Sequence, residues 1–318
     1  MTKIQSGIKI TAPITIGGLA VGLDILAFAL DKPAAEIVIQ KGATSGIQIK
    51  SISGDKGKLS TNISENPAGL AAQLVYEALI KAHNIDKSIG IEIDLRQKVL
   101  ANKGLGEKEA LAVVGAMAIN EFFGSLFSKK ELLPFINQAC TTLFPEYSLA
   151  ALSTSLMGGC MLICDKSTLD VRRLPVPQGI FFVLAYPTID IDPIPFPTFA
   201  AISSHGQIAI EQSRFLAGFF WAMYRSDFEL IGKTIQSPLF DTFAEEHYNY
   251  LKETKESALA AGALATGLCH TGPALFAFCT NTIAAEKCSK AITASFKKHN
   301  LRSQLFTSTI NNEGSFLE

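Results

Sequence analysis

The sequence predicts a two-domain protein of the α+β class, and three observations lead to this prediction. Its 318 residues exceed the usual size of a single domain. Apolar residues make up 48% and charged residues 18%, a balance that is typical of a globular chain with a large core. Apolar runs of strand length are interleaved with longer segments of helical period.

Strands and helices both occur in the first half of the chain. Strands are predicted at 6–12, 35–40, 46–52 and 89–95, where apolar residues alternate or run together. Asn66-Pro67 has the N-cap and first-turn signature of a helix that continues to about residue 82. Further helices are predicted at 107–123, ended by Gly124, and at about 130–140. The stretch "YSLAALSTSLMGGCMLICD" then predicts a helix, a Gly-Gly break and a strand.

A polar segment at 165–178 contains Pro175 and Pro177 and separates the two halves. We therefore predict domains at residues 1–170 and 171–318. The second domain is predicted to contain a strand at 179–186, helices at 207–224, 226–236 and 241–263, a strand at 274–280, a helix at 282–298 and a strand at 304–310. This order suits an α+β sandwich.

Composition argues against several classes of partner. The net charge of −1 and the scattered Lys and Arg residues give no electrostatic basis for binding nucleic acid. The run "FLAGFFWAMY" (215–224) is far shorter than the roughly 18 apolar residues that cross a membrane, and a buried helix face or a subunit interface explains it better. The N-terminus lacks the features of a secretory signal, so we expect a cytoplasmic protein with no nucleic-acid or membrane partner.

The sequence does not predict a metal site. None of the six cysteines forms a Cys-x-x-Cys pair. Cys160 and Cys164 lie four apart in an apolar run, which favours reduced, buried thiols on one face of a strand. Asp190 and Asp192 alternate with isoleucine in "TIDIDP". A metal-binding pair is one interpretation, but a solvated strand face is the simpler one.

Three separated stretches carry a glycine-rich turn. They are "APITIGGLAVGLDILAFALD" (12–31), "KGLGEKEALAVVGAMAINEFFG" (103–124) and "AGALATGLCHTGPALFAFC" (261–279). In the second, a Gly-Leu-Gly turn leads directly into a helix, where backbone N–H groups and the helix dipole favour phosphate. Such a turn on its own also occurs in many proteins without a ligand.

Together, in this order and spacing, the stretches resemble the motifs of the GHMP kinases, and most closely those of homoserine kinase. The family motifs are close to A-P-x-x-x-A-N-L-G-P-G-F-D-x-L-G, P-x-x-x-G-L-G-S-S-A-A-S and S-G-S-G-P-T. The matching residues are Ala12, Pro13, Leu19, Gly22, Asp24 and Leu26 in the first, Gly104, Leu105, Gly106 and Ala110 in the second, and Gly272 and Pro273 in the third. The resemblance covers essentially the whole chain.

The resemblance implies a GHMP kinase fold with a first domain of the ribosomal-protein S5 type and a ferredoxin-like second domain. It implies a cleft that binds ATP, Mg²⁺ and homoserine, with γ-phosphate transfer in threonine biosynthesis by a protein that is often a dimer. The phosphate-binding positions that it implies are Gly104, Leu105, Gly106, Glu107, Lys108 and Glu109. Those on the substrate side are Gly18, Asp24, His270, Thr271 and Gly272.

Many positions that carry chemistry in that family hold other residues here. The loop hydroxyls have become Glu107 and Lys108, and the first-motif asparagine has become Gly18. Alignment on the Gly158-Gly159 pair puts the family's magnesium glutamate at Cys140 and its H-x-D-N segment at Ser148, Leu149, Ala150 and Ala151. The two arginines for the substrate carboxylate have no counterpart in "DPIPFPTFAA" or "SPLFDTFAEE". No catalytic residue or metal ligand is therefore predicted.

The loop itself raises an electrostatic question. One carboxylate about 5 Å from a phosphate charge costs about 3 kcal/mol at an effective dielectric of about 20, which is more than a hundredfold in affinity. The simpler interpretation is that Glu107 and Glu109 stabilise the helix N-terminus, so the chain supplies its own anion where the family binds ATP. The competing interpretation is that Lys108 turns inward and retains triphosphate binding.

Two functions are compatible with these residues. We expect a degenerate homoserine-kinase-like protein with weak or absent phosphotransfer and a binding or regulatory role, acting as a homodimer or as a heterodimer with a related kinase. The alternative is an active ATP-dependent kinase of homoserine, or of a related small hydroxy compound, with a rewired site. His270 is the best remaining histidine, but the sequence shows no nucleophile or orienting group for it.

Overall fold

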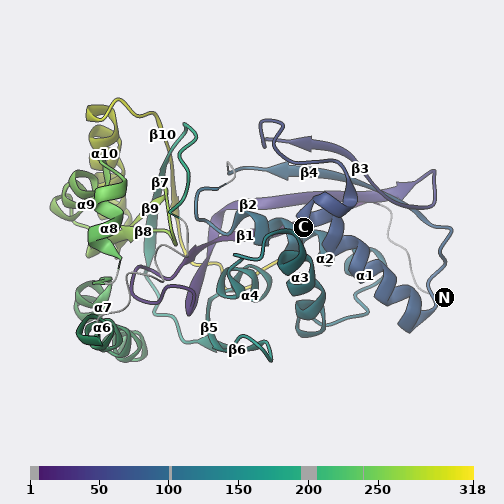
Figure 1. The fold of residues 1–318 in the computed structure, drawn as a ribbon, viewed down its shortest axis with the longest axis horizontal. Coiled ribbons are helices and arrows are strands. Elements are labelled where there is room, and N and C mark those ends of the chain that lie inside the picture. Colours follow the sequence, from purple (N-terminus) through teal and green to yellow (C-terminus); the bar gives the residue numbers. More distant parts are fainter. Residues whose placement is uncertain (1–6, 100–101, 195–205, 239) are drawn as a thin grey trace.

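The computed structural model describes residues 7–99, 102–194, 206–238 and 240–318, in which the strands form two sheets (Figure 1). A seven-stranded sheet comes mainly from the first half of the chain, and a four-stranded sheet comes from the second half. Helices pack on both sheets, which confirms the predicted α+β class.

The first sheet and its helices occupy the chain up to Leu174. Their elements are β1 (Ile8–Gly17), β2 (Leu26–Gly42), β3 (Gly46–Ser53), α1 (Pro67–His83), β4 (Gly90–Gln97), α2 (Glu107–Phe122), α3 (Lys129–Leu143), α4 (Leu149–Met157), β5 (Cys160–Asp165) and β6 (Asp170–Leu174). A last strand, β11 (Phe316–Leu317), returns from the C-terminus to pair with β1. The order is β11-β1-β2-β4-β3, with β5 beside β2 and β6 beside β5.

The second sheet has the order β10-β7-β9-β8. Its elements are β7 (Phe181–Pro187), α6 (Gly206–Arg225), α7 (Phe228–Thr234), α8 (Asp241–His247), α9 (Leu251–Ala260), β8 (Ala265–Leu268), β9 (Leu275–Cys279), α10 (Thr282–Lys298) and β10 (Ser303–Ser308). Side chains alternate along β7. Val183 and Ala185 join the core under α9 and α10, whereas Phe182 and Leu184 face the first sheet. The ring centroids of Phe182 and Phe28, which lies on β2, are 5.9 Å apart, so the two sheets share a core.

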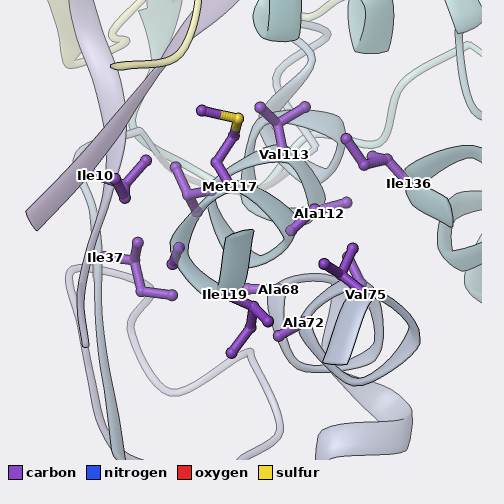
Figure 2. Packing of buried hydrophobic residues seen from close by; sticks show 14 of the residues in the cluster. Ile10, Ile37, Ala68, Ala72, Val75, Ala112, Val113, Met117, Ile119 and Ile136 are labelled. Atoms are coloured by element: carbon purple, nitrogen blue, oxygen red, sulfur yellow. The ribbon is translucent and has the colours of Figure 1, made fainter. Parts of the chain in front are cut away.

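The helices α1 and α2 pack closely against each other and against the first sheet. As predicted, Asn66 caps α1 by accepting hydrogen bonds from two backbone N–H groups, with Pro67 at the first helical position. Figure 2 shows side chains of β1 and β2 meeting those of α1, α2 and α3; it labels Ile10, Ile37, Ala68, Ala72, Val75, Ala112, Val113, Met117, Ile119 and Ile136. The alanines keep the two helix backbones near one another.

We expect the substitution Gly115→Ala to destabilise the protein by about 2 kcal/mol. A Cβ at Gly115 of α2 would lie 2.0 Å from the carbonyl oxygen of Ala68 and 2.7 Å from its Cα, so the helices must separate. The gain of about 1 kcal/mol in helix propensity offsets part of this strain. Urea unfolding measures the effect, with Gly206→Ala as the matched control because its Cβ would meet no described atom within 4 Å. Equal stability of the two variants would contradict the close packing.

Several elements differ from the sequence predictions. The strand predicted at 35–40 is the later part of β2, which begins at Leu26. The early part of β2 was not predicted, because the polar "DKP" interrupts its apolar pattern. The short strands β6 and β8 were not predicted, because "DVRRL" and "ATGL" carry little apolar pattern. The prediction that Cys160 and Cys164 are both buried is wrong for Cys164, which is exposed, because the register of β5 and β6 shifts between Ile163 and Asp165.

The single helix predicted at 241–263 is also wrong, because the chain forms α8 and α9 with a break at Tyr248 and Tyr250. Both tyrosine rings are buried. The Tyr248 hydroxyl donates to the carbonyl of Thr271 (2.9 Å), and the Tyr250 hydroxyl donates to that of Pro273 (2.7 Å). These bonds attach the break to the third glycine-bearing stretch.

In the described part of the chain, no helix is long and apolar enough to span a bilayer.

Candidate functional site

The three glycine-bearing stretches, far apart in sequence, meet between the two sheets. The N–H of Thr15 on β1 donates to the carbonyl of Leu105 (2.9 Å), and the N–H of His270 donates to that of Gly17 (3.2 Å). Gly104 has a φ of +79°, and a Cβ there would lie 2.3 Å from a carbonyl oxygen of the third stretch. Only glycine allows this approach. The stretches therefore form one site, as the resemblance implies.

A cavity of about 270 Å³ lies where the stretches meet. The described residues that line it are Thr15, Gly17, Asn102, Gly104, Gly106, Glu107, Lys108, Glu109, Phe144, Glu146, Tyr147, Ser148, Ala151, Pro193, Ile194, His270 and Thr271. Three of these are glutamates and one is a lysine. The volume lies just below the roughly 300–1,000 Å³ of common ligand pockets, so a small metabolite suits it better than a large one.

The Glu107 carboxylate accepts hydrogen bonds from backbone N–H groups of the loop. The donors are the N–H groups of Lys103 (2.7 Å) and Leu105 (3.3 Å). The side chain is buried, and burial raises its pKa to about 7 even though the backbone hydrogen bonds oppose the shift. Two loop N–H groups are therefore already engaged by the protein's own carboxylate.

Glu109 connects the start of α2 to the start of α4. Its carboxylate accepts a hydrogen bond from the N–H of Ser148 (2.9 Å), and burial raises its pKa. The hydroxyl of Ser148 in turn accepts a hydrogen bond from the N–H of Ala151 and caps α4. The positions that the resemblance assigned to the H-x-D-N segment thus form the cap and first turn of α4, and Ala150 among them is buried.

The lysines near the cavity contact aromatic rings. The Lys108 Nζ lies 5.6 Å from the centroid of the Phe144 ring, and the Lys166 Nζ lies 5.3 Å from that of Tyr147. Lys166 also forms an ion pair with Asp24 (3.2 Å). Lys108 therefore lies at the cavity wall, with its ammonium group over the Phe144 ring.

The substrate-side residues divide into two groups. His270 and Thr271 line the cavity, with 3.3 Å between the His270 Nδ1 and the Thr271 hydroxyl oxygen. Burial lowers the pKa of His270, and the charge of Asp24 opposes this shift. Gly18 and Gly272 are not among the described lining residues; both are turn glycines, with φ of +76° and +80°. One oxygen of Asp24, Oδ1, is buried and has no hydrogen-bond partner among the described residues.

At the position that the resemblance gives to a magnesium-binding glutamate, the chain holds a buried thiol and not an oxygen ligand. Cys140 lies on α3 with 0% exposure, and burial raises the pKa of its thiol well above the ordinary value, with the charge of Glu109 adding to the shift. Among the described residues, no group of three or more His, Cys, Asp and Glu side chains is placed to hold a metal ion. Asp190, the alternative metal candidate, is exposed and pairs with Lys58 (2.7 Å). The two segments that lack the family's substrate-binding arginines are residues 192–201 and 237–246. Within them, residues 195–201 and residue 239 lie outside the described part of the structure.

The sequence did not single out Lys103, although it precedes the loop glycine. Its side chain is buried, its Nζ donates to the carbonyl of Ile189 (2.9 Å), and burial lowers the pKa of its ammonium. This bond ties the loop to the segment after β7. Phe144, Glu146 and Tyr147 were also missed; their only signal was a mixed aromatic and acidic run before Ser148.

Comparisons with known proteins agree with this architecture. The family model "GHMP kinases C terminal" matches residues 219–298. A homoserine kinase of Chloroherpeton thalassium is 26% identical over 313 residues, which cover 96% of this chain and 97% of the relative. A homoserine kinase of Chlorobium phaeovibrioides is 27% identical with the same coverage.

Two solved structures show how far the likeness extends. The crystal structure of homoserine kinase from Cytophaga hutchinsonii superposes with a TM-score of 0.91 at 28% identity, covering 100% of this chain and 99% of the other. The L. major mevalonate kinase in complex with R-mevalonate superposes at 0.74 with 13% identity, covering 98% and 99%, and shares the fold alone.

Proposed function

Since this chain belongs to the GHMP kinase superfamily, on its homoserine kinase branch, we propose that it is a degenerate member whose phosphotransfer is weak or lost. In this proposal the cleft retains the shape of the kinase site and serves a binding or regulatory role for a small molecule. The protein acts in the cytoplasm alongside threonine synthesis, the pathway that the resemblance implies.

One observation carries the proposal: the Glu107 carboxylate accepts hydrogen bonds from the loop N–H groups of Lys103 and Leu105. A phosphate needs such donors, because they and the helix dipole supply its favourable electrostatic field. To reach these N–H groups, a phosphate must displace the Glu107 carboxylate or bind beside its negative charge. Phosphoryl transfer depends on positioning and charge neutralisation, and both are weakened here.

We expect no thermal stabilisation of the protein by millimolar Mg-ATP, and no homoserine-dependent release of ADP. A ligand at 100 times its Kd adds about 2.7 kcal/mol to the free energy of unfolding, which is easily detected as a rise in Tm. The homoserine kinase of Cytophaga hutchinsonii, assayed under the same conditions, is the positive control. A clear rise in Tm together with ADP release that requires homoserine would refute the proposal.

The alternative function is an active kinase of homoserine, or of a related small alcohol, with a rewired site. Lys108 favours this alternative, because its ammonium lies at the cavity wall. In this alternative, the Lys108 side chain turns from the Phe144 ring toward a bound phosphate. Under this alternative, Lys108→Ser abolishes any ATP-dependent rise in Tm.

A further inference from the structure

The charges that line the cavity are mainly negative. The described lining residues contribute three carboxyl groups, from Glu107, Glu109 and Glu146, and a single ammonium group, from Lys108. Burial lowers the pKa of His270 below its ordinary value of 6.5, so the imidazole carries little positive charge at neutral pH. A cavity of this composition attracts a cation and repels an anion.

The two buried carboxyl groups are not fully compensated by positive charge in the described part of the chain. Glu107 and Glu109 are 6% and 8% exposed, and burial raises the pKa of both. The negative charge of Glu109 raises the pKa of Glu107 further. The ammonium group of Lys108 opposes the shift at Glu109 without cancelling it. A cation bound beside these groups would offset both the burial and the repulsion.

The N-terminus of α2 does not reverse this preference. A helix N-terminus ordinarily favours anions, but here Glu107 and Glu109 lie in the first turn and compensate its partial positive charge. The Glu107 carboxylate also engages the N–H groups of Lys103 and Leu105. A carboxylate has about four acceptor positions, so both glutamates can still accept hydrogen bonds from a ligand. The start of α2 therefore offers acceptors to a ligand more readily than donors.

The hydroxyl group of Thr15 points independently to a ligand. Thr15 lines the cavity and is 0% exposed, and its hydroxyl oxygen has no hydrogen-bond partner among the described residues. The oxygen lies close to the loop, since a Cβ at Gly106 would come within 2.4 Å of it. A buried hydroxyl without a partner is costly and calls for one. An ammonium group has three N–H donors, so it can serve both a hydroxyl and a carboxylate.

Two aromatic rings in the lining also suit a cation. Phe144 and Tyr147 both line the cavity. Each ring already lies near an ammonium group of the protein, with the Lys108 Nζ 5.6 Å from the Phe144 centroid and the Lys166 Nζ 5.3 Å from that of Tyr147. The face of an aromatic ring carries negative potential and attracts cations. The aromatic part of the lining therefore has the same preference as its carboxyl groups.

We propose that the cavity binds a small aliphatic amine in its ammonium form, at the place where the family binds phosphate. The carboxylates of Glu107 and Glu109 accept hydrogen bonds from the ammonium group, and the Thr15 hydroxyl accepts a further one. Glu146, which is exposed, attracts a second ammonium group when the ligand is a diamine. The cavity volume of about 270 Å³ suits a chain of a few carbon atoms. The inference rests on the proposed binding role, because it names the class of ligand for the same cavity.

Isothermal titration of the full-length protein with putrescine, a four-carbon diamine, tests the inference. We use about pH 8, where a carboxyl group with a pKa of about 7 is mostly ionised. Putrescine should bind with a Kd below about 1 mM, and butanediol, its neutral analogue, should not bind.

Four variants locate the bound amine. Glu109→Gln keeps an acceptor for the N–H of Ser148 and should weaken binding at least about tenfold. Thr15→Val should weaken binding about fivefold without lowering the Tm of the free protein, because it removes an unpartnered hydroxyl. Glu146→Gln, at an exposed position, should weaken binding about threefold. Glu286→Gln removes an exposed carboxylate of α10 and is the matched control that should bind like the wild type.

Three results would overturn the inference. Butanediol that binds as tightly as putrescine would show that charge is not the basis of recognition. Putrescine binding that is equal in Glu109→Gln, Glu146→Gln and Glu286→Gln would place the amine outside the cavity. A protein that binds neither putrescine nor Mg-ATP contradicts this inference and leaves the proposed function intact, whereas one that binds Mg-ATP and not putrescine contradicts both.

Discussion

Replacing Glu107 with serine should strengthen binding of Mg-ATP by about a hundredfold at about pH 9, where a carboxyl group with a pKa of about 7 is fully ionised. The substitution frees the N–H groups of Lys103 and Leu105 and removes a buried carboxylate from their side. At about 5 Å and an effective dielectric of about 20, one such charge opposes a phosphate by about 3 kcal/mol, which sets the size of the effect. Isothermal titration of the wild type and the variant with Mg-ATP measures it directly.

Two further variants separate the causes. Glu146→Gln removes a charge from the same cavity without freeing any loop N–H group, so we expect only a small gain in affinity. The double variant Glu107→Ser with Lys108→Ser shows whether Lys108 attracts the phosphates, in which case it binds less tightly than Glu107→Ser alone. Unchanged affinity in Glu107→Ser would mean that the cleft excludes ATP by its shape, and that the carboxylate is not the cause.

The stability of the wild type relative to Glu107→Gln should fall by about 3 kcal/mol as the pH rises from 4.5 to 8. Burial raises the Glu107 pKa from 4.5 in the unfolded chain to about 7 in the folded protein. The folded state therefore holds this proton more tightly. The resulting stabilisation is complete below pH 4.5 and is lost as the pH rises through 7.

Urea unfolding at a series of pH values tests this dependence. Burial also raises the pKa of Glu109, but that residue is present in both proteins, so most of its contribution cancels in the difference. Glu109→Gln is the matched control and should retain the wild-type dependence that Glu107 causes. A stability difference between wild type and Glu107→Gln that does not change with pH would show that Glu107 titrates as an ordinary exposed carboxylate.

Much of the fold was predictable because local signals and packing agree. The Asn66-Pro67 cap, the small-residue face of α2 and the apolar runs of β4 and β9 all lead to the observed elements. The early part of β2 was not predictable, because its "DKP" interrupts the apolar pattern while pairing with β1 maintains the strand. Tertiary hydrogen bonds broke the helix at Tyr248 and Tyr250, and no local pattern reports those bonds.

The sequence identified several residues that line the cavity, but not the contacts that they make. The sequence placed Glu107 at the loop and suggested that the chain supplies its own anion, but it did not identify Lys103 and Leu105 as the donors. Nor did it predict that Lys108 would lie over Phe144, because that ring comes from the connection between α3 and α4. Contacts between elements that are distant in sequence depend on the fold as a whole.

Nuclear magnetic resonance tests the claim that the Glu107 carboxylate occupies the loop N–H groups. The measurement is a pH titration that follows the carboxyl carbon of Glu107 and the amide protons of Lys103 and Leu105. We predict that all three signals move together with an apparent pKa of about 7. A carboxyl that titrates near 4.5, with both amide protons unresponsive, would contradict the claim and leave the loop open to phosphate.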